Sequence, residues 1–304
     1  MVALRLPAFA KINLTLDVGS RRPDGYHEIC SVMQTVSIAD SLAFTRVEEG
    51  ITVTCASPAV PAGAGNLAYR ALALLLPRLP GGIRLDIEKR IPMAAGLGGG
   101  SSDAAAALRG ADLLYRLGLE EEELIRYAAR LGSDVPFFIL GGTVLARGRG
   151  EIVTRLPPLP SCWLVLVKPD FGVSTGEVYA RFRPGRGEPR TPKFISALAR
   201  GDRAGMLAAL GNDLEQVTVQ QYPAVLDRKA RLDGLGAEKT LMAGSGPAVF
   251  GIFPGESEAR FAAEQLAGGT DRVFICRTIA AEEIKSGKGI GGTDGKSGEE
   301  ITAR

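Results

Sequence analysis

The chain has 304 residues, of which 45% are hydrophobic, and a formal net charge of +2 at pH 7. This size and composition predict a globular protein with one large domain or two ordinary ones. The nearly neutral charge gives no general indication of nucleic-acid binding. No uncharged apolar run reaches the ~18 residues of a membrane span, and the first residues lack the apolar core of a signal peptide. The four scattered cysteines show no metal spacing, so we expect a soluble cytoplasmic protein with buried thiols and no nucleic-acid or membrane partner.

Strands dominate the elements predicted for the first ninety residues. Residues 4–18 alternate between apolar and polar side chains, which predicts a strand or a pair of strands with one buried face. Pro7 disfavours a single unbroken central strand there. Arg22-Pro23-Asp24-Gly25 is typical of a turn. Further strands are predicted over 29–38, 41–47, 51–55 and 83–89, and a helix over 65–77.

Helices become frequent after residue 100. Residues 102–117 are rich in alanine and predict one helix, and residues 120–131 predict another, with glutamates at its start and arginines near its end. Strands followed by helices are typical of an α+β fold. The proline-rich run 156–160 cannot continue a helix or a central strand. We therefore place a boundary there, between an N-terminal domain of residues 1–157 and a C-terminal domain of residues 158–284.

The C-terminal domain is expected to mix helices and strands. Helices are predicted over 191–199, 203–209, 222–233 and 256–267, and strands over 162–167, 248–253 and 272–278. A second glycine-rich turn, Met242-Ala243-Gly244-Ser245-Gly246-Pro247, precedes one of these strands. Residues 285–304 consist largely of Gly, Ser and charged residues, which predicts a disordered tail.

The most informative segment is the stretch from Ile91 to Asp103, named here the glycine loop. It places four glycines and two serine hydroxyls at the start of the alanine-rich helix. Glycines allow backbone N–H groups to approach an anion closely. The unpaired N–H groups and the positive dipole end of the helix point to the same place. This arrangement predicts a polyphosphate site.

The glycine loop differs from two better-known phosphate loops. It lacks the Gly-Lys-Ser/Thr of a Walker A loop, and Ser101 stands where a dinucleotide fingerprint has its third glycine. A plain strand-to-helix turn is the structural alternative, but such a turn does not need this much glycine. Ser101 or Ser102 could serve as a magnesium ligand or cap the helix.

Two charged residues suit a triphosphate site. Lys11 shares the polar face of the first strand with Asn13, and a solvated strand face is the alternative for both. Asp134 precedes an apolar run and could be a helix cap or a functional carboxylate. Phosphoryl transfer needs an acceptor of the hydroxyl proton and positive charge near the reacting oxygen. An aspartate and a lysine would supply them.

His27 is the only histidine of the chain and lies in Gly25-Tyr26-His27-Glu28. A zinc-binding helix needs a second histidine and is therefore excluded. A lone histidine is more often a packed, hydrogen-bonded residue than a catalyst. Beside Tyr26 it could also belong to a surface that stacks against and hydrogen-bonds a planar ring.

With these features the chain resembles the GHMP kinase superfamily over residues 5–280. Five blocks carry the resemblance: residues 8–14, 22–28, 92–104, 131–137 and 244–247. The block 22–28 is similar to that of members with a cytidyl diphosphate substrate. The resemblance implies a two-domain α+β fold, with an N-terminal domain like ribosomal protein S5 domain 2 and a ferredoxin-like C-terminal domain. It also implies transfer of the ATP γ-phosphoryl group, with Mg²⁺, to a hydroxyl of a small cytidyl diphosphate molecule in isoprenoid precursor synthesis.

The resemblance also assigns roles to residues. Asp134 would be the base and Lys11 its partner. ATP would be held by Ala94, Ala95, Gly96, Leu97, Gly98, Gly99, Gly100, Ser101, Ser102, Asp103 and Ala104. The substrate would contact Asn13, Tyr26, His27, Tyr179, Gly244, Ser245 and Gly246. We expect a monomer or a weak homodimer. The alternatives are a GHMP kinase with another acceptor, such as mevalonate or homoserine, and a binding protein that keeps the fold without catalysis.

Overall fold

The computed structural model describes residues 4–185, 187–286 and 298–302. These residues form two compact units. The first unit contains the described residues up to 10 together with 39–91 and 98–141, and the second contains 11–38, 92–97 and those from 142 onward. These units are not consecutive along the chain, because two long strands, β1 (Leu4–Arg21) and β2 (His27–Val47), each contribute residues to both of them. The domain boundary expected at residue 157 stays a prediction.

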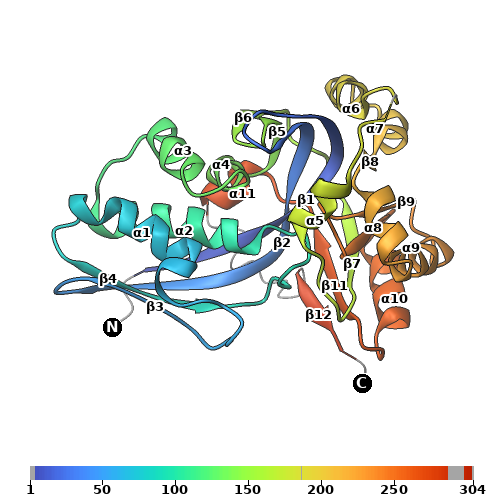
Figure 1. Ribbon diagram of the computed structural model, residues 1–304. Helices are drawn as coiled ribbons and strands as arrows, with labels where there is room; N and C mark the ends of the chain where they lie inside the picture. Colours follow the sequence, from blue (N-terminus) through green and yellow to red (C-terminus); the bar gives the residue numbers. More distant parts are fainter. Residues whose placement is uncertain (1–3, 186, 287–297, 303–304) are drawn as a thin grey trace. The chain divides into compact units, whose positions relative to one another are not determined.

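The first unit packs helices on one side of a sheet (Figure 1). Strand β4 (Gly82–Glu88) pairs antiparallel with residues 41–47 of β2 and parallel with β3 (Ile51–Cys55). The helices are α1 (Leu67–Leu75), α2 (Gly99–Tyr115), α3 (Glu121–Ala129) and α4 (Val135–Leu140). Their apolar side chains and those of the strands form one buried core.

Helix α2 owes its close contact with this sheet to small residues. Ala104, Ala105, Ala107 and Ala111 are almost completely buried. A Cβ atom at Gly110 would lie 2.2 Å from the Phe44 ring, so a larger residue would force helix and strand apart. This packing fixes the helix whose first turn contains the last residues of the glycine loop.

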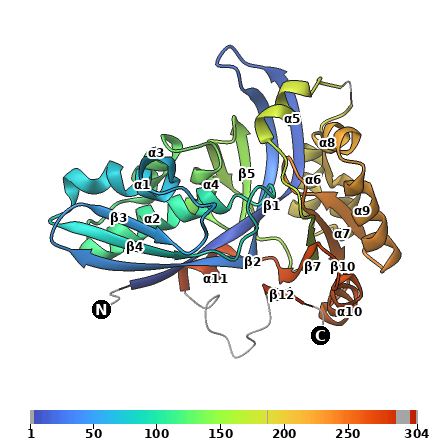
Figure 2. The ribbon, with the colours of Figure 1, turned by 60° about the horizontal axis from the view of Figure 1, so that its bottom comes forward.

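The second unit contains a five-stranded antiparallel sheet with the order β12-β11-β7-β10-β9. Its strands are β7 (Trp163–Lys168), β9 (Lys239–Met242), β10 (Val249–Phe253), β11 (Arg272–Arg277) and β12 (Glu299–Ile301). Helices α9 (Ala224–Gly234) and α10 (Glu256–Leu266) pack on this sheet (Figure 2). Apolar side chains of the sheet and of both helices form the core of the unit.

The remaining elements of the second unit extend the pairing of β1 and β2. Strand β5 (Thr143–Gly148) pairs antiparallel with residues 29–34 of β2 and with β6 (Ile152–Arg155). Strand β8 (Gly211–Asn212) pairs parallel with β1. The other helices are α5 (Thr175–Arg181), α6 (Arg190–Ala199), α7 (Arg203–Ala209), α8 (Glu215–Gln221) and α11 (Ala281–Ser286).

The predicted α+β class is confirmed, but several elements differ from the prediction. Strand β1 runs unbroken through Pro7. Among the described strands, β8 is the neighbour of β1 on the side away from β2 and pairs with it only at Thr15 and Leu16, so proline is tolerated at an edge. Likewise, β2 is one continuous strand where two were expected. The short elements α4, α5, α8, α11, β5, β6, β8 and β9 were not predicted.

Part of the predicted disordered tail is ordered. Residues 299–301 form β12 and pair with β11, where Arg272 makes an ion pair with Glu300. The tail is ordered here because β11 offers a partner strand, which the amino-acid composition of the tail does not indicate. Residues 287–297 of the predicted tail lie outside the described residues. No helix of the described residues is long and apolar enough to cross a membrane.

Candidate functional site

The first part of the glycine loop meets the 242–247 turn backbone to backbone in the second unit. Gly96 has a φ of +76° and Gly244 a φ of +54°, values that favour glycine. A Cβ atom at Gly96 would lie only 2.0 Å from the Ala243 carbonyl oxygen. The Lys11 backbone N–H donates to the Leu97 carbonyl oxygen at 3.0 Å. Strand β1, the first part of the glycine loop and the turn are thus brought together in the second unit.

Side chains that sequence reasoning missed hold the 242–247 turn. The Asn212 amide donates to the carbonyl oxygens of Met242 and Gly244, at 2.9 and 2.7 Å. Thr218 donates its hydroxyl to the Ser245 carbonyl oxygen at 3.1 Å, and the hydroxyls of Thr175 and Ser245 lie 2.8 Å apart. These residues belong to separate short elements, and no motif in the sequence points to them.

Lys11 and Asn13 are buried, which contradicts the alternative of a solvated strand face. Lys11 is 4% and Asn13 1% exposed. The Lys11 ammonium donates to the Asn13 side-chain oxygen at 2.7 Å, and the Asn13 amide donates to the Ser31 hydroxyl at 2.8 Å. The Ser31 hydroxyl in turn donates to the Thr15 carbonyl oxygen at 2.6 Å. A buried ammonium is costly without such partners, so the chain of hydrogen bonds orients Lys11.

In the first unit, the start of α2 can receive an anion. Gly98 is its N-cap residue, with a φ of +72°, and the first turn contains no acidic residue. Among the described residues, no side chain caps the helix; the Ser102 hydroxyl donates instead to the Phe9 carbonyl oxygen at 2.7 Å. The interpretation of Ser101 or Ser102 as a cap is therefore wrong. The unpaired N–H groups of the first turn are suited to phosphate oxygens.

Asp103, which the resemblance places in the ATP site, lies in a buried cluster with Lys89 and Asp40 in the first unit. Lys89 donates to Asp103 at 2.7 Å and also to Asp40, whose other carboxylate oxygen accepts the backbone N–H groups of Arg90 and Ile91. The second Asp103 carboxylate oxygen is buried and has no hydrogen-bond partner among the described residues. Burial raises the pKa of Asp103 to about 7, against the opposing effect of the Lys89 charge.

This raised pKa predicts a pH-dependent stability. The folded protein keeps the Asp103 proton up to about pH 7, whereas the unfolded chain releases it near the ordinary pKa of 3.8. The free energy of unfolding should therefore fall as the pH rises between these values, by at most about 1.4 kcal/mol per pH unit. Urea unfolding at pH 5, 6, 7 and 8 should show a smaller fall for Asp103→Asn than for the unchanged protein. Asp233→Asn, on the exposed surface of α9, is the control; equal profiles for all three proteins would contradict the assignment.

Asp134 is the N-cap residue of α4 and is half-buried. Within the described part of the first unit, its side chain makes no capping hydrogen bond to α4. Of the two interpretations from sequence, the side-chain cap is therefore wrong, and the functional carboxylate stays a prediction. Lys11 belongs to the second unit, so the pairing of Asp134 with Lys11 stays a prediction.

His27 and Tyr179 come together in the second unit. His27 is buried, and its Nδ1 lies 3.0 Å from the Gly19 carbonyl oxygen. Since a carbonyl only accepts, Nδ1 carries the proton, and Nε2 of a neutral ring is an acceptor. The ring centroids of His27 and Tyr179 are 5.8 Å apart, and Phe182 lies edge-on to His27 at 5.7 Å. The sequence analysis missed Phe182, which lies outside the five blocks that carry the resemblance.

Tyr26, the residue before His27, is exposed, with 53% of its surface accessible. Its backbone N–H donates to an Asp24 carboxylate oxygen at 3.1 Å, and Gly25 has a φ of +87°. The turn predicted over 22–25 is therefore present and presents the Tyr26 ring to solvent. An accessible tyrosine beside a buried histidine is suited to binding a planar ring.

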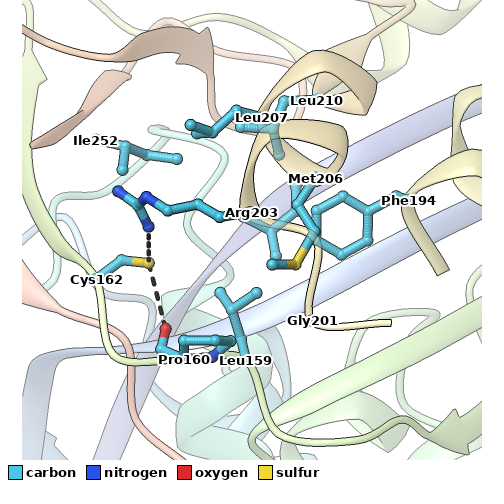
Figure 3. A pocket seen from close by; sticks show the side chains of 11 residues that line it. Leu159, Pro160, Cys162, Phe194, Gly201, Arg203, Met206, Leu207, Leu210 and Ile252 are labelled. Carbon is cyan, nitrogen blue, oxygen red and sulfur yellow. Dashed lines mark hydrogen bonds between the residues drawn. The ribbon is translucent and has the colours of Figure 1, made fainter. Parts of the chain in front are cut away.

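An apolar pocket of about 70 Å³ in the second unit is separate from these residues (Figure 3). The residues that line it include Phe194, Met206, Leu210 and Cys162. The Cys162 thiol donates to the Pro160 carbonyl oxygen at 3.2 Å, and burial raises its pKa even though Arg203 donates to its sulfur. A thiol of this kind is a poor nucleophile. In the described part of the chain, no group of three or more His, Cys, Asp or Glu side chains could hold a metal ion.

Comparison with known proteins agrees with these features. The family model for the GHMP kinases N terminal domain matches residues 66–142, and the GHMP kinases C terminal model matches residues 194–269. The 4-diphosphocytidyl-2-C-methyl-D-erythritol kinase of Moorella thermoacetica is 50% identical, over 92% of this chain and 100% of that protein. The kinase of the same name from Heliobacterium modesticaldum is 45% identical, over 92% and 97%.

Solved structures give the same result. A crystal structure of 4-(cytidine 5'-diphospho)-2C-methyl-D-erythritol kinase has a TM-score of 0.78 and 39% identity, covering 90% of this chain and 99% of that one. Homoserine kinase from Cytophaga hutchinsonii has a TM-score of 0.73 over 99% and 98% of the two chains, but only 16% identity. This second likeness concerns the fold alone.

Proposed function

The chain belongs to the GHMP kinase family, and from this membership we propose that it phosphorylates the 2-hydroxyl group of 4-diphosphocytidyl-2-C-methyl-D-erythritol. ATP supplies the γ-phosphoryl group, and the product is the 2-phosphate, an intermediate of the non-mevalonate pathway to isoprenoid precursors. The observation that carries this proposal is the 50% identity to a relative of this name over that relative's whole length. The buried His27 beside Tyr179 supports a cytidyl substrate.

The glycine loop binds the phosphates of ATP. Its fit to a polyphosphate rests on two observations: the left-handed glycines and the uncapped first turn of α2. Ala94, with a φ of +49°, adopts a conformation that is uncommon for a residue with a Cβ atom, and such strain gathers at ligand sites. Mg²⁺, when bound with ATP, neutralises charge on the phosphate oxygens. We assign Ser101 to it rather than Ser102, because Ser102 is buried against Phe9.

Asp134 and Lys11 carry the phosphoryl transfer. The Asp134 carboxylate accepts the proton of the acceptor hydroxyl as the oxygen attacks the γ-phosphorus. A new oxygen–phosphorus bond forms, the bond from the γ-phosphorus to its bridging oxygen breaks, and that electron pair leaves on ADP. The Lys11 ammonium favours the negative charge that develops on the attacking oxygen. The hydrogen bond from the Lys11 ammonium to Asn13 fixes the position of this positive charge.

The cytidyl group is recognised by the Tyr26, His27 and Tyr179 side chains. Stacking on an aromatic ring tolerates any base, whereas a histidine hydrogen bond can distinguish cytosine from other bases. The Asn13 amide and the backbone of residues 244–246 contact the rest of the substrate. The position of the new phosphate, determined by ³¹P NMR of the product, tests this proposal. Carbon 2 of the methylerythritol carries no hydrogen, so a phosphate on the 2-hydroxyl should give a ³¹P signal without three-bond coupling to hydrogen. A signal split by such coupling would place the phosphate on another hydroxyl and contradict the proposal.

His27→Ala should weaken binding of the cytidyl substrate more than binding of ATP. The expected effect is a rise in KM for that substrate of about tenfold, the value of one lost hydrogen bond to a polar ring, with the KM for ATP unchanged within about twofold. Steady-state kinetics with each substrate varied in turn would measure both constants. An equal rise for both substrates would assign His27 a purely structural role, through its hydrogen bond to Gly19.

A further inference from the structure

Arg149 lies against the exposed Tyr26 ring, a contact that the proposed reaction does not use. Its guanidinium carbon is 4.8 Å from the ring centroid. A cation over the face of a tyrosine ring at this distance is attracted by the negative face of the π-system. Nothing in the motifs of the sequence points to this arginine, which follows β5 at the tip of the β5–β6 hairpin.

The tip of the hairpin is anchored next to Tyr26. The Gly148 backbone N–H donates to a Glu28 carboxylate oxygen at 3.1 Å, and Gly148 has a φ of +73°. The Arg149 backbone N–H donates to Glu151 at 2.6 Å, and the Arg149 and Glu151 side chains approach to 3.7 Å. Because Glu28 lies two residues after Tyr26, these hydrogen bonds fix the backbone of residue 149, from which the Arg149 side chain extends, relative to the Tyr26 ring.

We propose that Arg149 is a positioning residue for the cytidyl group. Its guanidinium holds the Tyr26 ring and covers one face, so the base stacks on the remaining accessible surface. A ring that is 53% exposed would otherwise lose rotational freedom on binding, at a cost in affinity. The inference rests on the proposed function, since it takes the cytidyl group as the ligand.

A second way for an arginine to act here is direct contact with the diphosphate. The two roles differ in their dependence on phosphate. If Arg149 acts through Tyr26, its replacement should weaken the binding of cytidine, CMP and CDP equally. If it contacts phosphate, its replacement should weaken the binding of CDP most and that of cytidine least. Titration calorimetry of the full chain with these three probes therefore separates them.

The variants are Arg149→Ala, Arg149→Lys and Arg147→Ala. Arg147 is an exposed arginine of the same hairpin and controls for the loss of charge. We expect Arg149→Ala to weaken all three probes by the same factor of about two to five. The affinities of Arg149→Lys should lie between those of Arg149→Ala and the unchanged protein. Arg147→Ala should bind the three probes as tightly as the unchanged protein does. The kcat and the KM for ATP should stay unchanged in all three variants.

A double-mutant cycle with Tyr26→Ala tests whether Arg149 acts through the ring. In that background, Arg149→Ala should have no further effect on the affinity for cytidine. A further loss there, a loss that grows from cytidine to CDP, or unaltered binding by Arg149→Ala would each overturn the inference. If the unchanged protein binds none of the three probes, the proposed function itself fails and the inference falls with it. These outcomes are therefore distinguishable.

Discussion

Replacing Asp134 with asparagine should lower kcat by about two to four orders of magnitude. The amide keeps the shape of the side chain but cannot accept the proton of the acceptor hydroxyl. The affinity for ATP should change by less than about twofold, because the proposed ATP site is the glycine loop. Steady-state kcat and a direct titration of ATP would measure the two quantities separately.

Glu120→Gln is the matched control for this prediction. Glu120 is also an N-cap residue in the first unit, at the start of α3, and its side chain likewise makes no capping hydrogen bond within the described residues. Its replacement removes one charge from a helix N-terminus, which should alter stability by less than about 1 kcal/mol and leave kcat unchanged. Near-normal turnover by Asp134→Asn would disprove the assignment of the base.

Gly96→Ala should have the second large effect. Alanine at a φ of +76° is strained, and its Cβ atom would lie 2.0 Å from the Ala243 carbonyl oxygen. That atom belongs to the backbone of a turn held by Asn212, so the loop and the turn must move apart. We expect the free energy of unfolding to fall by about 2–4 kcal/mol. The kcat/KM should fall by about 100-fold or more, because displacement of about 1 Å can cost this much.

Gly234→Ala is the control for this substitution. Gly234 ends α9, and a Cβ atom there would meet no atom within 4 Å. Alanine is the better helix former, so stability should be equal or slightly higher. Urea unfolding and steady-state kinetics of both variants provide the comparison. If Gly96→Ala retains normal stability and activity, the close approach of the two loops does not exist in solution.

The parts of the site that could be predicted are those with a local signature. The conformation of the glycine loop could be predicted because its glycines are adjacent in sequence. Helix α2 was expected from the alanine content of its own residues. The turn at residues 22–25 was expected from Pro and Gly. The buried state of Lys11 was not decided by the sequence, because alternation fixes only which side chains share a face and not which face is covered.

The parts that could not be predicted depend on residues distant in sequence. Asn212 and Thr218 act on the turn at 242–247 from two short elements, and neither residue type has a distinctive pattern. Lys89, Asp40 and Asp103 form one cluster from three segments. Arg149 reaches Tyr26 only because β5 pairs with β2. Strand β12 forms because β11 offers it an edge, which outweighs the polar composition of the tail.

Selectivity for the phosphoryl acceptor tests the central claim most directly. The measurement is release of ADP by the purified protein with ATP and Mg²⁺, comparing 4-diphosphocytidyl-2-C-methyl-D-erythritol, mevalonate and homoserine as acceptors. We predict turnover that depends on the cytidyl substrate alone. Turnover with mevalonate or homoserine instead would contradict the substrate assignment, and ATP binding without turnover of any of the three acceptors would contradict the assignment of kinase activity.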